Sequence, residues 1–109
     1  MEPTLLLLLH HGPAHGYTLL GALNDYGLEG TDPSAVYRAL RDMEGQGWVA
    51  STWEGEQTLG PPRRISRLTA RGDETLGLWT RDLQETRAMI DRLLAAYDRH
   101  MQEDKGEHH

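Results

Sequence analysis

The chain has 109 residues, of which 38% are hydrophobic and 26% are charged, and it contains no cysteine. This length and composition fit one globular domain with room for an added helix. The lack of cysteine excludes disulfides, thiolate catalysis and cysteine zinc sites. The longest apolar run, residues 5–9, is far shorter than the roughly 20 residues of a membrane span. It also lacks a basic start and a cleavage site, so we expect a cytoplasmic protein.

The charge is unevenly distributed along the chain. The net charge of −6 argues by itself against a nucleic-acid partner. Residues 1–32 and 72–109 each carry a net −4, whereas residues 33–71 carry six arginines against four acids, a net +2. Arginine is the cation whose planar guanidinium can form two parallel hydrogen bonds with a phosphate or a base edge. The middle third is therefore the candidate for contact with an anionic partner, although six arginines could equally form a solvated surface.

Three helices are predicted in the first half of the chain. Pro3 suits the first turn of a helix that ends at residue 11, and its five leucines predict burial on more than one side. A second helix is predicted over residues 15–26. A third is predicted from Asp32, a good N-cap, to about residue 46. A glycine follows each of the three helices and is the expected stop signal.

The third helix separates an apolar side from a polar side. At 100° per residue, Val36, Leu40 and Met43 fall within about 60° of one another. The opposite side presents a hydroxyl, a phenol and two guanidiniums. These groups belong to Ser34, Tyr37, Arg38 and Arg41. They can bind phosphates and base edges, but they could also form a solvated face on which Arg38 pairs with Asp42.

A hairpin and a long helix are predicted in the second half. Residues 48–54 are rich in β-branched and aromatic side chains and predict a strand. The segment 55–62, with two glycines and two prolines, predicts a loop, and residues 63–68 predict the returning strand. Thr69 is the expected cap of a last helix that runs to about residue 102.

The last helix carries a heptad pattern of apolar residues. Leu76, Leu83, Ile90 and Tyr97 repeat every seven residues. Trp79, Thr86, Leu93 and His100 occupy the offset positions, with Leu94 beside them. A helix this long cannot bury such a stripe on a body of about 70 residues, so we expect pairing with a second copy. The predicted dimer interface is Leu76, Leu83, Ile90, Leu93, Leu94 and Tyr97.

The predicted fold is mostly α with a small β-hairpin. Three helices followed by a hairpin is the order of a winged helix-turn-helix, in which the third helix reads the DNA groove and the hairpin is the wing. We expect a winged-helix domain over residues 1–69, a C-terminal dimerisation helix over 70–103 and a polar tail over 104–109. The final Glu107-His108-His109 could be native or the start of a purification tag.

Three segments carry more specific signatures. Gly12-Pro13-Ala14-His15-Gly16-Tyr17 fits the pattern G-P-x-H-G-Y between the first two helices. Residues 34–40, followed by Met43-Glu44 and Gly47-Trp48-Val49, fit a recognition helix and its exit. Gly60-Pro61-Pro62-Arg63-Arg64, then Arg67-Leu68-Thr69 and Gly72, fit the return strand of a wing. On these segments, which lie in order and with the correct spacing, the chain resembles the PadR family of bacterial transcriptional regulators over residues 4 to about 75.

The resemblance implies a homodimer joined through the long C-terminal helix. It implies binding to a palindromic DNA operator, usually as a repressor, and often release by a small aromatic or otherwise hydrophobic ligand. A single C-terminal helix is similar to the compact subgroup of the family. The chain departs from the family pattern at Ile65 and Ser66, where aromatic residues usually stand, and in lacking a basic N-terminal extension.

The candidate functional residues follow from the polar side of the third helix and from the resemblance. The predicted DNA contacts are Ser34, Tyr37, Arg38 and Arg41, with Arg63 and Arg64 beside the wing tip. Trp79 lies near the start of the predicted heptad pattern. The resemblance to compact family members makes it a candidate for stacking on a flat ligand at the dimer centre, and packing in the interface is the alternative.

The sequence gives less support to metal binding, to enzymatic activity and to a protein partner in place of DNA. His10, His11 and His15 look like a metal cluster, but Gly12-Pro13 interrupts the helix that would align them, and no nearby acid completes a site. No nucleophile elbow or phosphate loop is present, so we expect neither an enzyme nor a cofactor. The alternative function is a winged-helix dimer that binds a protein partner and has lost DNA binding, which the charge of −6 favours.

Overall fold

The computed structural model describes residues 1–54 and 63–107, and this part of the chain is mostly helical with a small antiparallel sheet. The predicted fold class is therefore confirmed. In chain order the elements are α1 (Glu2–His11), β1 (Ala14–His15), α2 (Gly16–Ala22), the 3₁₀ helix η1 (Leu23–Tyr26), α3 (Pro33–Gly45), β2 (Val49–Glu54), β3 (Arg63–Leu68) and α4 (Ala70–Glu107). The chain divides into two compact units, Met1–Gly77 and Leu78–His109, and α4 begins in the first of them.

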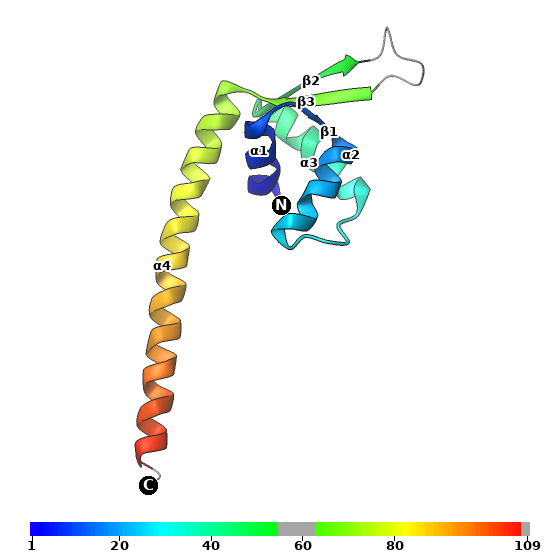
Figure 1. Cartoon of the computed structure of the whole chain (residues 1–109). Helices are drawn as coiled ribbons and strands as arrows, with labels where there is room; N and C mark the ends of the chain where they lie inside the picture. The colour runs from blue at the N-terminus through cyan, green and yellow to red at the C-terminus, as the bar shows by residue number, and fades with distance from the viewer. Residues whose placement is uncertain (55–62, 108–109) are drawn as a thin grey trace. The chain divides into compact units, whose positions relative to one another are not determined.

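The first unit is built around an apolar core that its helices share. Figure 1 shows α1, α2 and α3 on one side of the sheet. Among the described residues, the buried apolar core consists of Leu5, Leu6, Leu9, Leu19, Leu23, Val36, Ala39, Leu40, Met43 and Val49. Three leucines of α1 are buried, as its apolar run predicted. Val36, Leu40 and Met43 form the buried side of α3, and this also agrees with the helical spacing.

The sheet has three strands in the order β1-β3-β2, all antiparallel, whereas the sequence predicted a two-stranded hairpin. The additional strand, β1, pairs Ala14 with Ser66 and His15 with Ile65. The sequence could not indicate it because two residues show no alternating pattern. The extended backbone of Gly12, with φ 160° and ψ 164°, ends α1 and leads into β1 beside β3.

Several predicted boundaries needed correction. The predicted helix over residues 15–26 is α-helical only to Ala22, after which the chain tightens into η1. Gly27, with φ 73°, then ends it in the left-handed conformation that glycine adopts without steric cost. β2 begins one residue later than predicted, at Val49. α4 extends to Glu107 and so includes most of the predicted polar tail, while the predicted loop over residues 55–62 lies outside the described residues.

The junction between the sheet and α4 is closed by hydrogen bonds of Thr69. Its hydroxyl donates to the carbonyl oxygen of Gly47 at 2.6 Å and accepts from the backbone N–H of Gly72 at 3.0 Å. Thr69 is thus the helix cap that the sequence predicted. A Cβ atom on Gly72 would collide with the backbone carbonyl of Trp48, so only glycine fits at this point.

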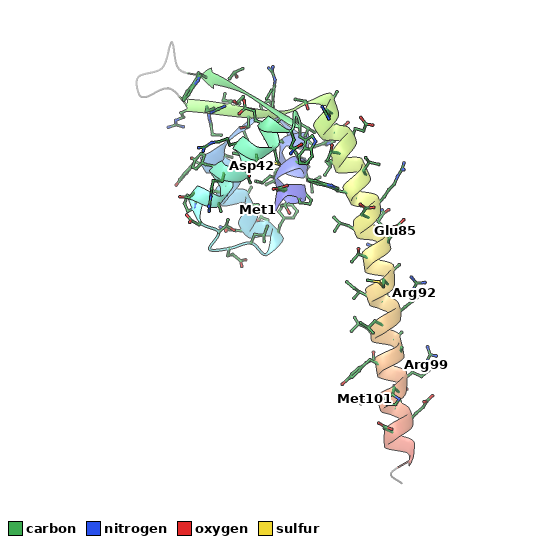
Figure 2. The ribbon with its side chains drawn as sticks, turned by 180° about the vertical axis from the view of Figure 1, so that it is seen from behind. Met1, Asp42, Glu85, Arg92, Arg99 and Met101 are labelled. Carbon is green, nitrogen blue, oxygen red and sulfur yellow. The ribbon has the colours of Figure 1, made fainter. Side chains whose placement is uncertain are left out.

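The second unit consists of the rest of α4, and its apolar side chains are exposed. Leu83, Ile90, Leu93 and Tyr97 all belong to the exposed large hydrophobic residues of the chain. Figure 2 shows Arg92 and Arg99 projecting from the same side of the helix, as expected for positions seven residues apart. No helix in the described part of the chain has the length and apolar character needed to cross a membrane.

Candidate nucleic-acid interface

The outward side of α3 carries the four predicted contact residues. Ser34, Tyr37, Arg38 and Arg41 are all exposed, and the Tyr37 side chain is 50% accessible. The Nε of Arg38 donates to the carbonyl oxygen of Ser34 at 3.4 Å, and no ion pair between Arg38 and Asp42 is found among the described residues. The α3 surface thus presents two guanidiniums, neither of which is paired with an acid within the described chain.

The start of this helix is fixed by its cap. Asp32 has extended backbone, and its carboxylate accepts a hydrogen bond from the Ser34 N–H at 3.0 Å. Pro33 follows as the first helical residue, where its missing N–H costs no hydrogen bond. These two residues fix where α3 begins, and the burial of Val36, Leu40 and Met43 decides which of its side chains face outward.

Tyr37 is seated on the first turn of α2. A Cβ atom built on Gly16 would lie 2.5 Å from Cε1 of Tyr37, which is closer than two carbon atoms can approach. Gly16 is buried, and its lack of a side chain provides the space that the tyrosine ring occupies. The position of the Tyr37 ring therefore depends on a glycine in the preceding helix.

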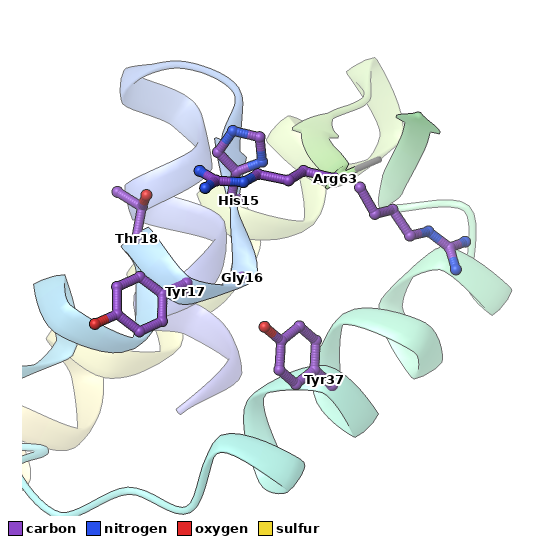
Figure 3. Close-up of a pocket in the computed structure, with 7 residues that line it drawn as sticks. His15, Gly16, Tyr17, Thr18, Tyr37 and Arg63 are labelled. Carbon is purple, nitrogen blue, oxygen red and sulfur yellow. The ribbon is translucent and has the colours of Figure 1, made fainter. Parts of the chain in front are cut away.

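A hollow of about 530 Å³ lies between α2, α3 and the sheet. Its lining comprises His15, Gly16, Tyr17, Thr18, Tyr37, Arg63 and Arg64. Figure 3 shows the Tyr17 and Tyr37 rings at this hollow and the Arg63 side chain extending toward His15. The geometry thus brings the outer side of α3 together with the first residues of β3, which the sequence had placed in separate elements.

The two arginines of β3 differ in their surroundings. Among the side chains that the structure describes, none is a hydrogen-bond or ion-pair partner of Arg63. In contrast, Nη2 of Arg64 lies 2.6 Å from Oε2 of Glu44, and its Nε donates to Oγ of Ser51 at 2.7 Å. The Arg64 guanidinium also lies 6.0 Å from the centre of the Trp53 ring. The sequence suggested equal roles for these neighbours, and the structure distinguishes them.

Two residues of this surface, Tyr17 and Glu44, are not among the contacts predicted from the sequence. Tyr17, which is 80% accessible, was considered only as part of the G-P-x-H-G-Y signature. Glu44 was considered only as part of the exit from the third helix. At 100° per residue Tyr17 falls on the side of the second helix that faces away from Leu19, and this spacing was a usable signal. Nothing in the sequence indicated that Glu44 would meet an arginine 20 positions away.

His10, His11 and His15 do not come together in one cluster. His10 and His11 meet edge to face with ring centres 6.5 Å apart, and Nε2 of His10 lies 3.5 Å from a carboxylate oxygen of Asp73. His15 lies in β1 and lines the hollow described above. Of the His, Asp and Glu side chains that the structure describes, no three are placed to hold a metal ion.

The remaining predicted site residues belong to α4. Leu83, Ile90, Leu93, Leu94 and Tyr97 are exposed along the second unit, and Leu76, in the first, is half-buried. The side chain of Trp79 is also half-buried. The structure describes a single chain, so the roles of these residues in a dimer or a ligand site stay predictions.

Comparison with known proteins gives one family. The sequence model described as "Transcriptional regulator PadR-like family" matches residues 5–78, which include α1 to β3 and the start of α4. No curated protein matches the chain.

Three solved structures illustrate the likeness. A PadR family transcription regulator from hypervirulent Clostridium difficile R20291 is 20% identical with a TM-score of 0.77, over 85% of this chain and 96% of that one. A conserved protein of unknown function, described as a potential transcriptional factor, is 34% identical with a TM-score of 0.80, over 93% and 90%. Bacillus subtilis PadR in complex with operator DNA is 20% identical with a TM-score of 0.65, over 72% and 45%.

Proposed function

We infer the function from the premise that this chain belongs to the PadR-like family of transcriptional regulators, whose members are not enzymes. The protein is accordingly a transcriptional regulator. We propose that it binds a palindromic DNA operator as a homodimer and acts as a repressor. The complex of Bacillus subtilis PadR with operator DNA supports double-stranded DNA as the ligand.

The observation that carries this proposal is the exposed polar side of α3 next to Arg63. A helix that buries Val36, Leu40 and Met43 leaves its hydroxyl, phenol and guanidinium groups on the outside. Arginine can donate two hydrogen bonds at once to a guanine edge or a phosphate, and serine and tyrosine can donate one to a phosphate oxygen. We assign DNA contact to Ser34, Tyr37, Arg38, Arg41 and, from the wing, Arg63. Arg64 is held by Glu44, and we propose a different role for it.

Dimerisation through α4 is the second part of the proposal. An operator with two-fold symmetry requires two recognition helices about one helical turn of DNA, or a multiple of it, apart. The exposed apolar side of α4 supports a second copy of this helix as the partner, because its residues repeat every seven positions.

We further propose that a small aromatic ligand stacks on Trp79 near the centre of this dimer. Trp79 stands at an offset position of the same heptad pattern as the interface residues. Titration of the purified protein with planar aromatic compounds should quench tryptophan fluorescence, and Trp79→Ala should abolish the quenching. Quenching that is unchanged in the variant, or absent in the wild type, would leave only the packing role for this residue.

The decisive experiment is selection of bound sequences from random double-stranded DNA with the full chain. We expect a palindromic consensus and an affinity that falls steeply with salt, because phosphate contacts release counterions. Arg41→Ala should weaken binding to the selected site by about 1–3 kcal/mol. It should leave the thermal midpoint nearly unchanged, since its side chain is exposed. Affinity equal to wild type would remove Arg41 from the interface.

The same experiment distinguishes operator binding from the alternative function, which is binding of a protein partner without DNA. A winged-helix dimer that binds only a protein partner would yield no consensus and no salt-dependent binding to any DNA. Repression is tested separately, by placing the selected operator between a promoter and a reporter gene. Lower reporter expression in the presence of the protein supports a repressor, and higher expression would identify an activator.

A further inference from the structure

We propose that Glu44 and Arg64 form a clamp that fixes the wing against the recognition helix, so that Glu44 is a positioning residue for DNA binding. The inference rests on the proposed function and deepens it. It assigns a role to an acidic residue on a surface that is otherwise expected to meet phosphates.

The clamp joins the last turn of α3 to both strands of the wing. Oε2 of Glu44 receives Nη2 of Arg64 at 2.6 Å, while Oε1 of the same carboxylate accepts from Oγ of Ser51 at 2.7 Å. The Nε of Arg64 donates to that Ser51 hydroxyl, also at 2.7 Å. Three side chains from α3, β2 and β3 thus close a ring of hydrogen bonds in which both carboxylate oxygens are used.

The strand register explains why these residues meet. Trp53 lies opposite Arg64 and Ser51 lies opposite Ser66, so all four side chains belong to the same face of the hairpin. Ser66 is 5% exposed, so this face is turned toward the body of the domain at Ser66, whereas Trp53, farther along the hairpin, is 71% exposed. Arg64 therefore reaches inward toward α3 and also lies over the ring of Trp53. Arg63, its neighbour, belongs to the other face.

The geometry argues against a direct phosphate contact for Arg64. A guanidinium already paired with a carboxylate presents little net positive charge and has used two of its N–H directions. A small hollow of about 90 Å³ is lined by Tyr37, Arg41, Glu44 and Arg64, among others, so the clamp borders the proposed contact residues. Fixing the wing here would set the position of Arg63 relative to Arg41.

Glu44→Gln distinguishes an effect of long-range charge from an effect of the clamp, because the two predict opposite changes in DNA affinity. If long-range charge alone matters, removing an acid from a DNA-binding surface strengthens binding. If the clamp positions the wing, Glu44→Gln weakens binding to the selected operator by about tenfold despite the gain in net charge. The matched control is Asp42→Asn, which removes one acid from an exposed position of the same helix. It should bind as tightly as wild type or more tightly.

Arg64→Lys tests the other half of the clamp. Lysine keeps the positive charge but lacks the planar set of N–H donors with which the guanidinium bonds Glu44 and Ser51 at the same time. We expect Arg64→Lys to weaken binding about as much as Glu44→Gln, and the double variant to be no weaker than either single one. The slope of log affinity against log salt should not change, whereas loss of a phosphate contact would lower it by about one.

The possible results distinguish a failure of the proposed clamp from a failure of the proposed DNA-binding function on which it rests. Wild-type protein that binds no DNA sequence would overturn both. Wild-type binding with Glu44→Gln equal or tighter would overturn the clamp alone. Thermal unfolding of each variant and hydrogen exchange of the β2 and β3 amides provide a readout without DNA. Faster exchange in both single variants, at an unchanged overall fold, is the result expected from a loosened wing, and unchanged exchange would contradict the clamp.

Discussion

At the scale of single residues, the most informative position is Gly16. Its missing side chain leaves the space in which the Tyr37 ring lies, so a residue of α2 controls a side chain of the recognition helix. The sequence showed Gly16 only as one letter of a signature. The structure supplies a physical reason for glycine at this position, which is close packing rather than a turn.

Gly16→Ala should separate the position of Tyr37 from the stability of the fold. The added methyl group must displace the Tyr37 ring, which is half exposed and can swing outward, so we expect a change in stability of less than about 1 kcal/mol. DNA affinity should fall by about tenfold, or roughly 1.4 kcal/mol, if Tyr37 contacts the operator. Fluorescence anisotropy with labelled operator and thermal unfolding measure the two effects.

The matched control is Gly21→Ala in the same helix. A Cβ atom there would meet nothing within 4 Å, so affinity should stay at the wild-type value. The protein should gain up to about 1 kcal/mol from the better helix propensity of alanine. Equal affinities of both variants would exclude Tyr37 as a DNA contact.

At the scale of elements, the sequence predicted what short-range rules govern. The cap at Asp32, the buried side of α3 and the cap at Thr69 all depend on residues within one or two helical turns, and all are present. Strand β1 and the clamp at Glu44 depend on partners 50 and 20 residues away in the sequence. Such contacts leave no periodic pattern, so the sequence alone could not place them.

The junction of the sheet with α4 gives a prediction of stability. Gly72→Ala would drive a methyl group into the Trp48 carbonyl, which is backbone and cannot move aside as a side chain can. We expect a loss of about 2–3 kcal/mol in the free energy of unfolding, because the start of α4 must shift from its cap. Chemical denaturation measures this loss.

Gly77→Ala is the reference for the Gly72 variant, since it lies on the same helix with open space around it. It should be neutral or stabilising by up to about 1 kcal/mol. Similar stabilities of the two alanine variants would show that the approach of Gly72 to Trp48 is not important for folding.

At the scale of the whole molecule, the exposed apolar stripe of α4 connects assembly with DNA binding. Leu83, Ile90 and Tyr97 are 55%, 45% and 58% accessible in the single chain. Exposed apolar residues that repeat every seven positions favour a coiled-coil partner, and contiguous apolar patches of this kind mark interaction sites. If the partner is a second copy, each dimer presents two recognition helices, and the second half-site is bound intramolecularly.

Ile90→Asp tests whether DNA binding depends on dimerisation through α4. An aspartate buried between two paired helices would lose its hydration without gaining a hydrogen-bond or ion-pair partner. Sedimentation should show a dimer for wild type and a monomer for Ile90→Asp, with affinity for a palindromic operator reduced on the order of a hundredfold. Arg92→Asp introduces the same side chain nearly opposite Ile90 on the helix, at 100° per residue. It should remain dimeric and bind DNA far better than Ile90→Asp. A monomeric wild type that still binds the palindrome tightly would disconnect α4 from recognition, and the two-fold symmetry of the site would then need another source.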